Sequence, residues 1–269
     1  MAFECPAVAT LNRAIDVPQN LIGSSLLQTI VCMKWGTRYP ALYVNRLWSM
    51  IKRHTKRPTR LVCFTDDATE VDAEVDTFPL PSIRIEDDIA FTPWRKLSLW
   101  QAPLADLAGD VLFLDLDIVI TGDLDAIFDF RPGTFCVCEN WTQLGQGIGN
   151  TSVFRWHVGK NTHIFDDFEK NGIAIRKKYG IEQVYISDVV DEMAFWPREW
   201  CVSFKHTLLP AWPLNFFRTP PLPDNTRIVA FTGKPDPDEA AIGKWPVNAP
   251  WKRIYKHVRS TPWIDEHWQ

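Results

Sequence analysis

Apolar residues in this chain gather into short runs that alternate with amphipathic stretches. Residues 28–33 form an apolar run typical of a buried strand, and the apolar spacing over residues 42–51 predicts a helix. A second apolar run at residues 60–65 predicts another strand, and residues 94–107 have helical spacing. Strands that alternate with helices in this way indicate βαβ units and a mostly parallel sheet.

The strongest apolar run covers residues 111–120 and contains Asp115 and Asp117. Side chains two residues apart lie on the same face of a strand, so both carboxylates should lie on one face. Two ionised carboxylates among apolar residues repel each other and lose hydration, and the free-energy cost of both effects must be compensated. A divalent cation would compensate, because Mg²⁺ and Mn²⁺ bind carboxylates together with substrate phosphates. A strand that ends in a solvated acidic turn is the alternative.

The second half of the chain has a less regular pattern. Short strands are predicted at residues 135–138, 151–154 and 229–232, and a helix at residues 161–171. Residues 196–250 are rich in Pro and Trp. We interpret this segment as irregular structure that covers the site, because it is too apolar to be a linker.

The order of the motifs resembles that of GT-A glycosyltransferases, and most closely glycosyltransferase family 8 and its bacterial relatives. Asp115-Leu116-Asp117 resembles the Asp-x-Asp motif of these enzymes. The resemblance implies that Asp115 contacts the nucleotide ribose or the metal, that Leu116 lies at the nucleotide sugar, and that Asp117 ligates the metal. Similar segments occur in the family's order over about residues 28–240, which is most of the chain.

The resemblance assigns further residues to the donor sugar. Lys96 resembles the basic residue that steadies the donor phosphate or sugar. Asn150 and Ser152 belong to a segment similar to the one that lines the donor sugar. Glu182 and Gln183 resemble the Asp-Gln pair that lies near the anomeric carbon, and they are the implied catalytic residues.

The nucleotide part of the donor is assigned in the same way. Gly233 and Lys234 resemble the Gly-Lys-Pro element, whose lysine binds the diphosphate. In a parallel sheet, ligands bind beyond the carboxyl ends of the strands, so the base and ribose should lie near residues that follow the first two strands. These residues are Lys34, Trp35, Gly36, Thr65 and Asp66.

Two positions depart from the family pattern. The family supplies a third metal ligand, a His just before the Gly-Lys-Pro element, whereas Ala230 and Thr232 occupy the candidate places here. His206 could substitute, although a lone His is more often structural. Glu182 stands where the family has Asp, and its extra methylene would shift the carboxylate. The third ligand of the Mn²⁺ or Mg²⁺ cofactor is therefore left open.

The composition is that of an ordinary globular protein. The chain has 269 residues, of which 46% are hydrophobic and 23% charged. We expect a single GT-A-like domain at residues 28–269, with a mostly parallel central sheet flanked by helices and an irregular Pro/Trp-rich C-terminal part. Residues 28–130 would form the nucleotide-binding half, and residues 131–269 the donor-sugar and acceptor half. Residues 1–27 would be a loose N-terminal extension.

The net charge and the cysteines indicate which partners and which cellular compartment to expect. The net charge is −4 and no long basic block occurs, which argues against nucleic acid binding. The basic run at residues 52–57 is either a solvated helix end or a patch for phosphate or anionic lipid. The six cysteines form no Cys-x-x-Cys motif, so we interpret them as reduced core residues in a reducing compartment.

Neither a membrane span nor a signal peptide is expected from the hydrophobic pattern. We therefore expect a cytoplasmic protein with no transmembrane segment, and a peripheral contact with the inner face of the membrane is left open. Most of the 13 tryptophans should pack in the core, while others could stack on sugar rings or lie at a membrane interface.

The resemblance implies a hexosyltransferase that moves a sugar from a nucleotide-diphosphate donor to an acceptor hydroxyl. The acceptor would be a bacterial surface glycan or a lipid-linked saccharide, and the reaction would be metal-dependent and retain configuration. One alternative is a degenerate protein that binds a nucleotide sugar without turnover. Another is a haloacid-dehalogenase-type phosphatase, with Asp115 as nucleophile, Asp117 as general acid, and Asp188 and Asp191 as the downstream acidic element.

Overall fold

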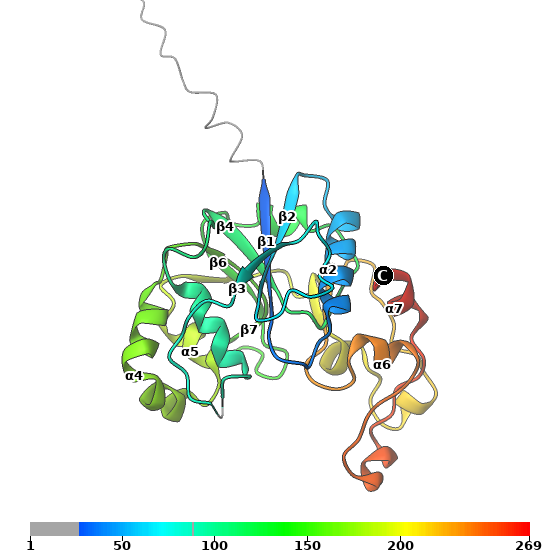
Figure 1. The fold of residues 1–269 in the computed structure, drawn as a ribbon. Coiled ribbons are helices and arrows are strands. Elements are labelled where there is room, and N and C mark those ends of the chain that lie inside the picture. The colour runs from blue at the N-terminus through cyan, green and yellow to red at the C-terminus, as the bar shows by residue number, and fades with distance from the viewer. Residues whose placement is uncertain (1–26, 88) are drawn as a thin grey trace, which may run out of the picture.

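The computed structural model describes residues 27–87 and 89–269 and is built around a seven-stranded sheet (Figure 1). The predicted N-terminal extension, apart from its last residue, lies outside the described residues. The strands of the main sheet are β1 (Gln28–Lys34), β2 (Thr59–Thr65), β3 (Asp76–Pro79), β4 (Asp110–Leu114), β6 (Phe135–Glu139), β7 (Gly149–His157) and β8 (Met193–Phe195). Their order in the sheet is β3-β2-β1-β4-β7-β6-β8.

The main sheet is mostly parallel, which confirms the predicted fold class. β3, β2, β1 and β4 pair in parallel, and β8 pairs in parallel with β6. Only β7 runs against its neighbours β4 and β6. In the β1–β4 pairing Val31 lies opposite Phe113, so the residues that follow β4 lie beside the end of β1.

The expected continuous strand over residues 111–120 is wrong. β4 ends at Leu114, and the chain enters a second sheet as β5 at Ile118. This three-stranded sheet consists of β5 (Ile118–Ile120), β10 (Ile228–Ala230) and β9 (Cys201–Ser203), in the order β5-β10-β9. The apolar residues of the run are buried in two different sheets, and the segment from Asp115 to Asp117 links them.

Helices cover both faces of the main sheet (Figure 1). The long ones are α2 (Ala41–His54), α4 (His163–Tyr179) and α5 (Glu182–Val189), and the short ones are α3 (Asp125–Asp129), α6 (Pro237–Ala241) and α7 (Pro262–His267). The predicted helix at residues 94–107 is only a 3₁₀ helix, η1 (Pro93–Trp100). Helical geometry stops there because Pro103 disfavours a helical conformation at Ala102.

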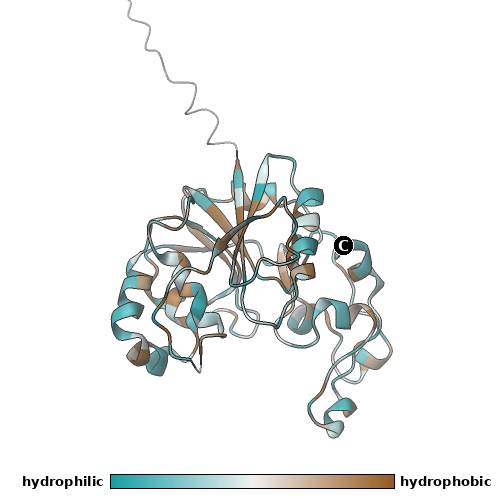
Figure 2. Ribbon diagram, in the orientation of Figure 1, coloured by the Kyte–Doolittle hydropathy of each residue, from teal (hydrophilic) through white to brown (hydrophobic). Residues whose placement is uncertain are grey.

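Alternate residues of β1 enter two separate cores. Ile30 and Cys32 face the core formed with α2 and the second sheet, whereas Val31 and Met33 face the core formed with η1, α4 and α5. Figure 2 shows the resulting concentration of hydrophobic residues in the central strands. The central strands β1 and β4 are buried on both faces, so each contains a continuous apolar run.

The five cysteines in the described part of the chain are buried and free, as expected: Cys32, Cys63, Cys136, Cys138 and Cys201. Cys5 lies outside the described residues. None of the described helices is long and apolar enough to cross a bilayer. The basic run at residues 52–57 is the end of α2 and the loop after it, and its Lys52 and Arg57 pair with Glu74 and Asp129.

The C-terminal third is largely irregular, as predicted, although β9, β10 and α6 lie within it. After β9 its other elements are the single turns η2 (Phe204–Leu208), η3 (Leu214–Phe216) and η4 (Pro250–Ile254) and the short helix α7. The loop that carries η4 projects from the body of the molecule, at the lower right of Figure 1.

Candidate active site

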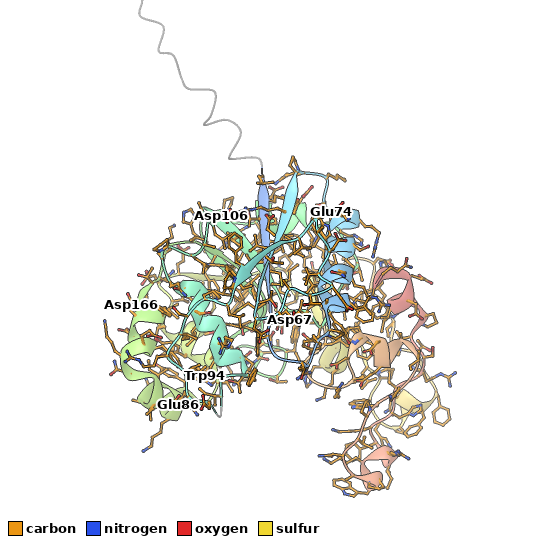
Figure 3. The ribbon with its side chains drawn as sticks, in the orientation of Figure 1. Asp67, Glu74, Glu86, Trp94, Asp106 and Asp166 are labelled. Carbon is orange, nitrogen blue, oxygen red and sulfur yellow. The ribbon has the colours of Figure 1, made fainter. Side chains whose placement is uncertain are left out.

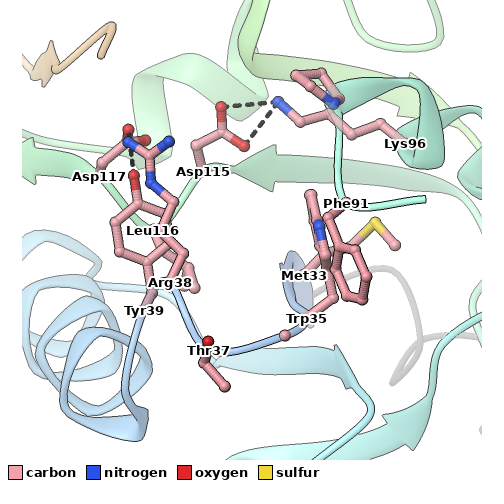
Figure 4. A pocket seen from close by; sticks show the side chains of 12 residues that line it. Met33, Trp35, Thr37, Arg38, Tyr39, Phe91, Lys96, Asp115, Leu116 and Asp117 are labelled. Carbon is pink, nitrogen blue, oxygen red and sulfur yellow. Dashed lines mark hydrogen bonds and ion pairs between the residues drawn. The ribbon is translucent and has the colours of Figure 1, made fainter. Parts of the chain in front are cut away.

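The carboxyl ends of β1, β2 and β4 meet at one edge of the main sheet. Asp67 follows β2 at this edge, whereas Asp106 pairs with Arg60 near the start of β2, at the opposite end of the sheet (Figure 3). A cavity of about 470 Å³ opens at this edge (Figure 4). Six of the sequence-predicted residues line it: Trp35, Gly36, Lys96, Asp115, Leu116 and Asp117.

Asp115 forms an ion pair with Lys96 in the wall of the cavity. The Lys96 Nζ lies 2.7 Å from one carboxylate oxygen and 2.8 Å from the other, and it also donates to the Thr151 carbonyl at 3.1 Å. The Lys96 side chain is only 5% exposed. A buried ammonium requires an opposite charge and hydrogen-bond acceptors, and these contacts use all three of its donors.

Asp117 has a different environment. The Tyr39 hydroxyl donates to Asp117 Oδ2 at 2.8 Å, and the backbone N–H of Phe231 donates to the Asp117 carbonyl at 3.0 Å. Burial, and next the charge of Asp115, raises the pKa of Asp117 to about 7, although the hydrogen bond from Tyr39 acts in the opposite direction. Burial also raises the pKa of the Tyr39 hydroxyl, so Tyr39 remains a hydrogen-bond donor.

Arg38 is a cation of the cavity wall that the sequence analysis missed. Its guanidinium is within 3.5 Å of Asp236 and lies 4.9 Å from the centre of the Tyr39 ring. The side chain remains 58% exposed. Arg38 follows the end of β1 by four residues, and its place at the cavity depends on the turn at Gly36.

Lys234 does not line the cavity. Its Nζ contacts Asp236 at 2.5 Å and Glu239 at 2.8 Å. The same two acidic residues form a capping box at the start of α6, so Lys234 is held against that helix N-terminus. Since Asp236 also contacts Arg38, Lys234 is one side chain removed from the cavity wall.

The residues assigned to the donor sugar form a second group beside the cavity. The Asn150 side-chain amide donates to Gln183 at 3.4 Å, and its oxygen accepts from the Ser152 N–H at 3.0 Å. Thr151, between them, donates from its hydroxyl to the buried Glu182 carboxylate at 2.7 Å. The carbonyl of Thr151 accepts from Lys96, so this group adjoins the cavity, and its contact with the donor sugar stays a prediction.

Three further predicted residues, at the ends of β1 and β2, support the wall from behind and do not line it, and Gly233 does not line it either. The Lys34 ammonium is buried and donates to the Asp67 carbonyl at 2.9 Å, and the Thr65 hydroxyl donates to the same carbonyl. Asp66 accepts from the Gly36 N–H at 2.9 Å. These contacts fix the turn that places Trp35 and Gly36 at the cavity. Direct contacts of Lys34, Thr65 and Asp66 with the nucleotide sugar stay a prediction.

Gly36 is required by the shape of this turn. Its φ is +62°, which disfavours other residues, and a Cβ built there would lie 3.0 Å from the ring of Phe91. Phe91 is exposed and was also missed by the sequence analysis. A glycine therefore brings the backbone next to an aromatic ring at the mouth of the cavity.

The oxygen donors at the site fit a hard divalent cation that is held jointly with phosphate. Within residues 27–87 and 89–269, no three His, Cys, Asp or Glu side chains cluster as a metal site, so His206 does not join the two aspartates. The buried Thr232 hydroxyl has no hydrogen-bond partner and follows Phe231, the residue bonded to Asp117. Mg²⁺ is commonly bound by one or two carboxylates plus substrate phosphates.

The acidic element required by a haloacid-dehalogenase-type phosphatase is not at this cavity. Asp188 is exposed and contacts the Tyr179 hydroxyl at 2.6 Å and Lys178 at 3.7 Å. Asp191 is also exposed on the surface after α5. Neither lines the cavity, so the geometry disfavours this interpretation.

The fold is similar to that of known glycosyltransferases. No family model matches the chain, and no curated protein sequence is significantly similar to it. The galactosyltransferase LgtC, in complex with donor and acceptor sugar analogues, has a TM-score of 0.54 and 13% identity, with 78% of this chain and 89% of LgtC covered. An LgtC active-site mutant also has a TM-score of 0.54, with 14% identity and 84% and 99% coverage.

The bifunctional glycosyltransferase WbbM has the same TM-score of 0.54 at 12% identity. The match covers 90% of this chain and 52% of WbbM. The chain therefore has the GT-A glycosyltransferase fold, as the resemblance to family 8 implies. At these identities the likeness concerns the fold, and the activity must be argued from the site.

Proposed function

We propose that the chain is a glycosyltransferase that moves a hexosyl group from a nucleotide-diphosphate donor to an acceptor hydroxyl. One observation carries the proposal. The Lys96–Asp115 ion pair and Asp117 lie together in the wall of a cavity of about 470 Å³, at the carboxyl edge of a parallel sheet with the GT-A fold. Ligands of such sheets bind at this edge.

The cavity has an aromatic end and a charged end, which matches the two parts of a nucleoside diphosphate. Trp35 and Phe91 lie at one end, and Arg38 and Asp117 lie at the other (Figure 4). Aromatic rings stack on nucleobases, and a guanidinium binds phosphate oxygens in a bidentate way. The base and ribose therefore lie at Trp35, and the diphosphate lies between Arg38 and Lys96.

The donor sugar lies beside β7 and the start of α5. Asn150 and Gln183 contact each other there, and Glu182 is held by Thr151. A buried carboxylate close to the anomeric carbon stabilises the positive charge that develops as the leaving group departs. The amide groups of Asn150 and Gln183 supply hydrogen bonds that orient the sugar hydroxyls.

The transfer breaks the bond between the anomeric carbon and the phosphate oxygen, and forms a bond to the acceptor oxygen on the same face. Because the new bond forms on the face that the phosphate leaves, configuration is retained, and the acceptor proton goes to the departing phosphate. Lys96 and Arg38 stabilise the charge of that phosphate. A divalent cation bound to Asp117, with help from Asp115, would supply further neutralisation of the leaving diphosphate.

The acceptor is a surface glycan or a lipid-linked saccharide, and the protein works in the cytoplasm. The acceptor reaches the site from the C-terminal third, which consists largely of single turns and irregular loops. Loops of this kind commonly carry specificity on a rigid scaffold.

The experiment that tests the function is calorimetry with a panel of nucleoside diphosphates and nucleotide sugars, followed by a turnover assay. Binding of one nucleotide sugar with release of its nucleoside diphosphate supports a transferase. Binding without turnover, even with glycan and glycolipid acceptors, identifies a degenerate protein instead. Hydrolysis of simple phosphate esters without nucleotide-sugar binding contradicts the proposal in favour of a phosphatase.

A further inference from the structure

Two segments of the C-terminal third form one projecting unit. We call residues 209–218 and 244–259 together the projection. Its second segment, drawn in orange to red, extends beyond the body of the molecule (Figure 1). The carboxyl end of β1, where the cavity opens, faces the same lower side in this view.

The two segments are joined by side-chain hydrogen bonds to backbone carbonyls. The Trp212 indole N–H donates to the Ile254 carbonyl at 3.0 Å. The Asn215 amide donates to the carbonyls of Tyr255 and His257 at 3.0 and 2.9 Å. Asn215 is buried, so these bonds fix the second segment on the first.

The projection exposes an unusual amount of apolar surface. It holds six of the 13 large apolar side chains that are exposed in the described residues. All 13 tryptophans of the chain are described, and only two, Trp212 and Trp251, are exposed. The six side chains are Trp212, Leu214, Phe217, Trp251, Ile254 and Tyr255. Exposed apolar clusters on a soluble domain mark interaction surfaces.

The projection is also uniformly basic, in a chain whose net charge is −4. Its two segments contain no Asp or Glu, and they contain six cations: Arg218, Lys244, Lys252, Arg253, Lys256 and Arg259. Across the described ranges, none of these cations forms an ion pair with a carboxylate. Their charges are therefore available to a partner.

The basic run at the end of α2 differs in this respect. Lys52 lies 2.6 Å from Glu74, and Arg57 lies 2.6 Å from Asp129. The flanking surface there is mixed in charge, and no exposed tryptophan accompanies it. Of the two basic stretches, only the projection combines uncompensated positive charge with exposed indole rings.

We propose that the projection docks this protein onto an anionic lipid surface. Indole and phenol rings lie at the headgroup level of bilayers, and neighbouring Lys and Arg side chains bind lipid phosphates. A neutral glycan would also stack on tryptophans, but it would not account for six cations without an acidic residue. Charge complementarity therefore favours anionic lipid as the partner.

Docking of this kind would place the carboxyl end of β1, after which Trp35 and Gly36 line the cavity, on the lipid side, because this strand end and the projection lie on the same lower side in Figure 1. The use of this orientation rests on the proposed transferase function, since the orientation would bring a lipid-linked acceptor to the site. Lipid binding itself does not depend on that function. The two ideas can therefore fail separately.

The test is co-sedimentation of the full chain with lipid vesicles of phosphatidylcholine alone or with 30% phosphatidylglycerol (roughly the anionic content that gives a strong surface potential). We expect sedimentation with the anionic vesicles only, and a loss at high salt. The double variant Lys252→Glu, Arg253→Glu should bind more than about twentyfold more weakly, since each cation near the surface contributes about fivefold.

Matched variants on α4 serve as controls. Lys170→Glu with Lys177→Glu changes two exposed lysines by the same charge, and should retain vesicle binding. Ile254→Ser should weaken binding, whereas Ile173→Ser should not, although the two isoleucines are 67% and 71% exposed. Circular dichroism and thermal unfolding check that each variant is folded.

Three results would overturn the proposal. They are equal binding to neutral and anionic vesicles, no vesicle binding by the wild type, and equal losses in the projection and α4 variants. Binding of a soluble neutral oligosaccharide that depends on Trp251, without vesicle binding, would assign the projection to glycan instead. Nucleoside-diphosphate binding is measured in parallel, and its absence would count against the transferase function alone.

Discussion

The Lys96 ammonium contacts both carboxylate oxygens of Asp115, at 2.7 and 2.8 Å. An incoming diphosphate would compete with Asp115 for this cation, because phosphate oxygens are equally good acceptors. As Lys96 turns towards phosphate, the Asp115 oxygens become available to a metal ion. Nucleotide and metal should therefore enter the site together.

The first prediction concerns metal binding. Without nucleotide, Mn²⁺ and Mg²⁺ should bind poorly, since Asp115 is paired with Lys96 and, in the described residues, no third His, Cys, Asp or Glu side chain joins the two aspartates. A nucleoside diphosphate should tighten metal binding, and by linkage the metal should tighten nucleotide binding by the same factor. Calorimetric titration of Mn²⁺ with and without nucleotide measures both effects.

Thr232→His provides the matched variant for that titration. The substitution adds an imidazole one residue after Phe231, whose N–H bonds to Asp117, and it should favour Mn²⁺ over Mg²⁺. Tight binding of Mn²⁺ by the wild type without nucleotide would reveal a ligand outside the donor set described above. Absence of metal binding even with nucleotide would indicate a metal-independent site.

The second prediction concerns the buried ion pair. Lys96→Met should lower the free energy of unfolding by about 3 kcal/mol, because it leaves the Asp115 carboxylate without its partner. The double variant Lys96→Met, Asp115→Asn should recover part of this loss. Urea denaturation measures both, with Lys170→Met on the surface of α4 as the control. A single variant as stable as the wild type would contradict the role given to the pair.

The third prediction concerns Asp117. Asp117→Asn should leave the fold intact and reduce sugar transfer by roughly a hundredfold or more, because the amide cannot replace the charge that holds a cation. Steady-state transfer assays measure the loss, and Asp265→Asn on exposed α7 is the control. Transfer at the wild-type rate would exclude Asp117 from the reaction.

The fourth prediction is a pH dependence of stability without ligands. The pKa of Asp117 is raised to about 7, mainly by burial, so the folded protein holds a proton that the unfolded chain releases near pH 4. Its contribution to the free energy of unfolding should therefore fall as the pH rises from about 4 to 7. Denaturation over this range should show a shallower fall in Asp117→Asn than in the wild type. Parallel curves would place the carboxylate in a solvated environment.

The fifth prediction compares two cations near the diphosphate. Arg38→Gln should weaken nucleoside-diphosphate binding by about tenfold, because Arg38 lines the cavity. Lys234→Ala should also weaken nucleoside-diphosphate binding, with much less effect on acceptor binding. Its effect should be smaller than that of Arg38→Gln, since two carboxylates already hold Lys234. Calorimetry with the diphosphate compares them. Unchanged affinity in Lys234→Ala would remove Lys234 from the site.

The sequence predicted the elements that are set by apolar runs. β1 and β2 are buried on both faces, so each is a continuous apolar stretch that stands out from its surroundings. The break between β4 and β5 could not be predicted in this way. Residues 111–114 and 118–120 are equally apolar, and only their partners β7 and β10, which lie far along the chain, separate them into two sheets.

Asp115 and Asp117 could be singled out because two carboxylates in an apolar run need compensation, and Lys96 because of the family resemblance. All three line the cavity, and their roles stay predictions. Arg38 and Tyr39 were missed because their positions depend on the turn at Gly36. That turn is fixed by contacts across the sheet edge, and no local pattern reveals them. Residues that reach a site by loop conformation are harder to predict than residues at strand ends.

The link between the two sheets makes the carboxylate spacing sensitive to distant packing. The Asp115 N–H bonds to Ser152 in β7, whereas the Asp117 carbonyl bonds to Phe231 just after β10. Each aspartate therefore follows the movement of a different sheet. A substitution inside the small sheet, such as Val229→Ala, would change the distance between the carboxylates without touching either one. Variants that tune this site would then be found well away from its cavity.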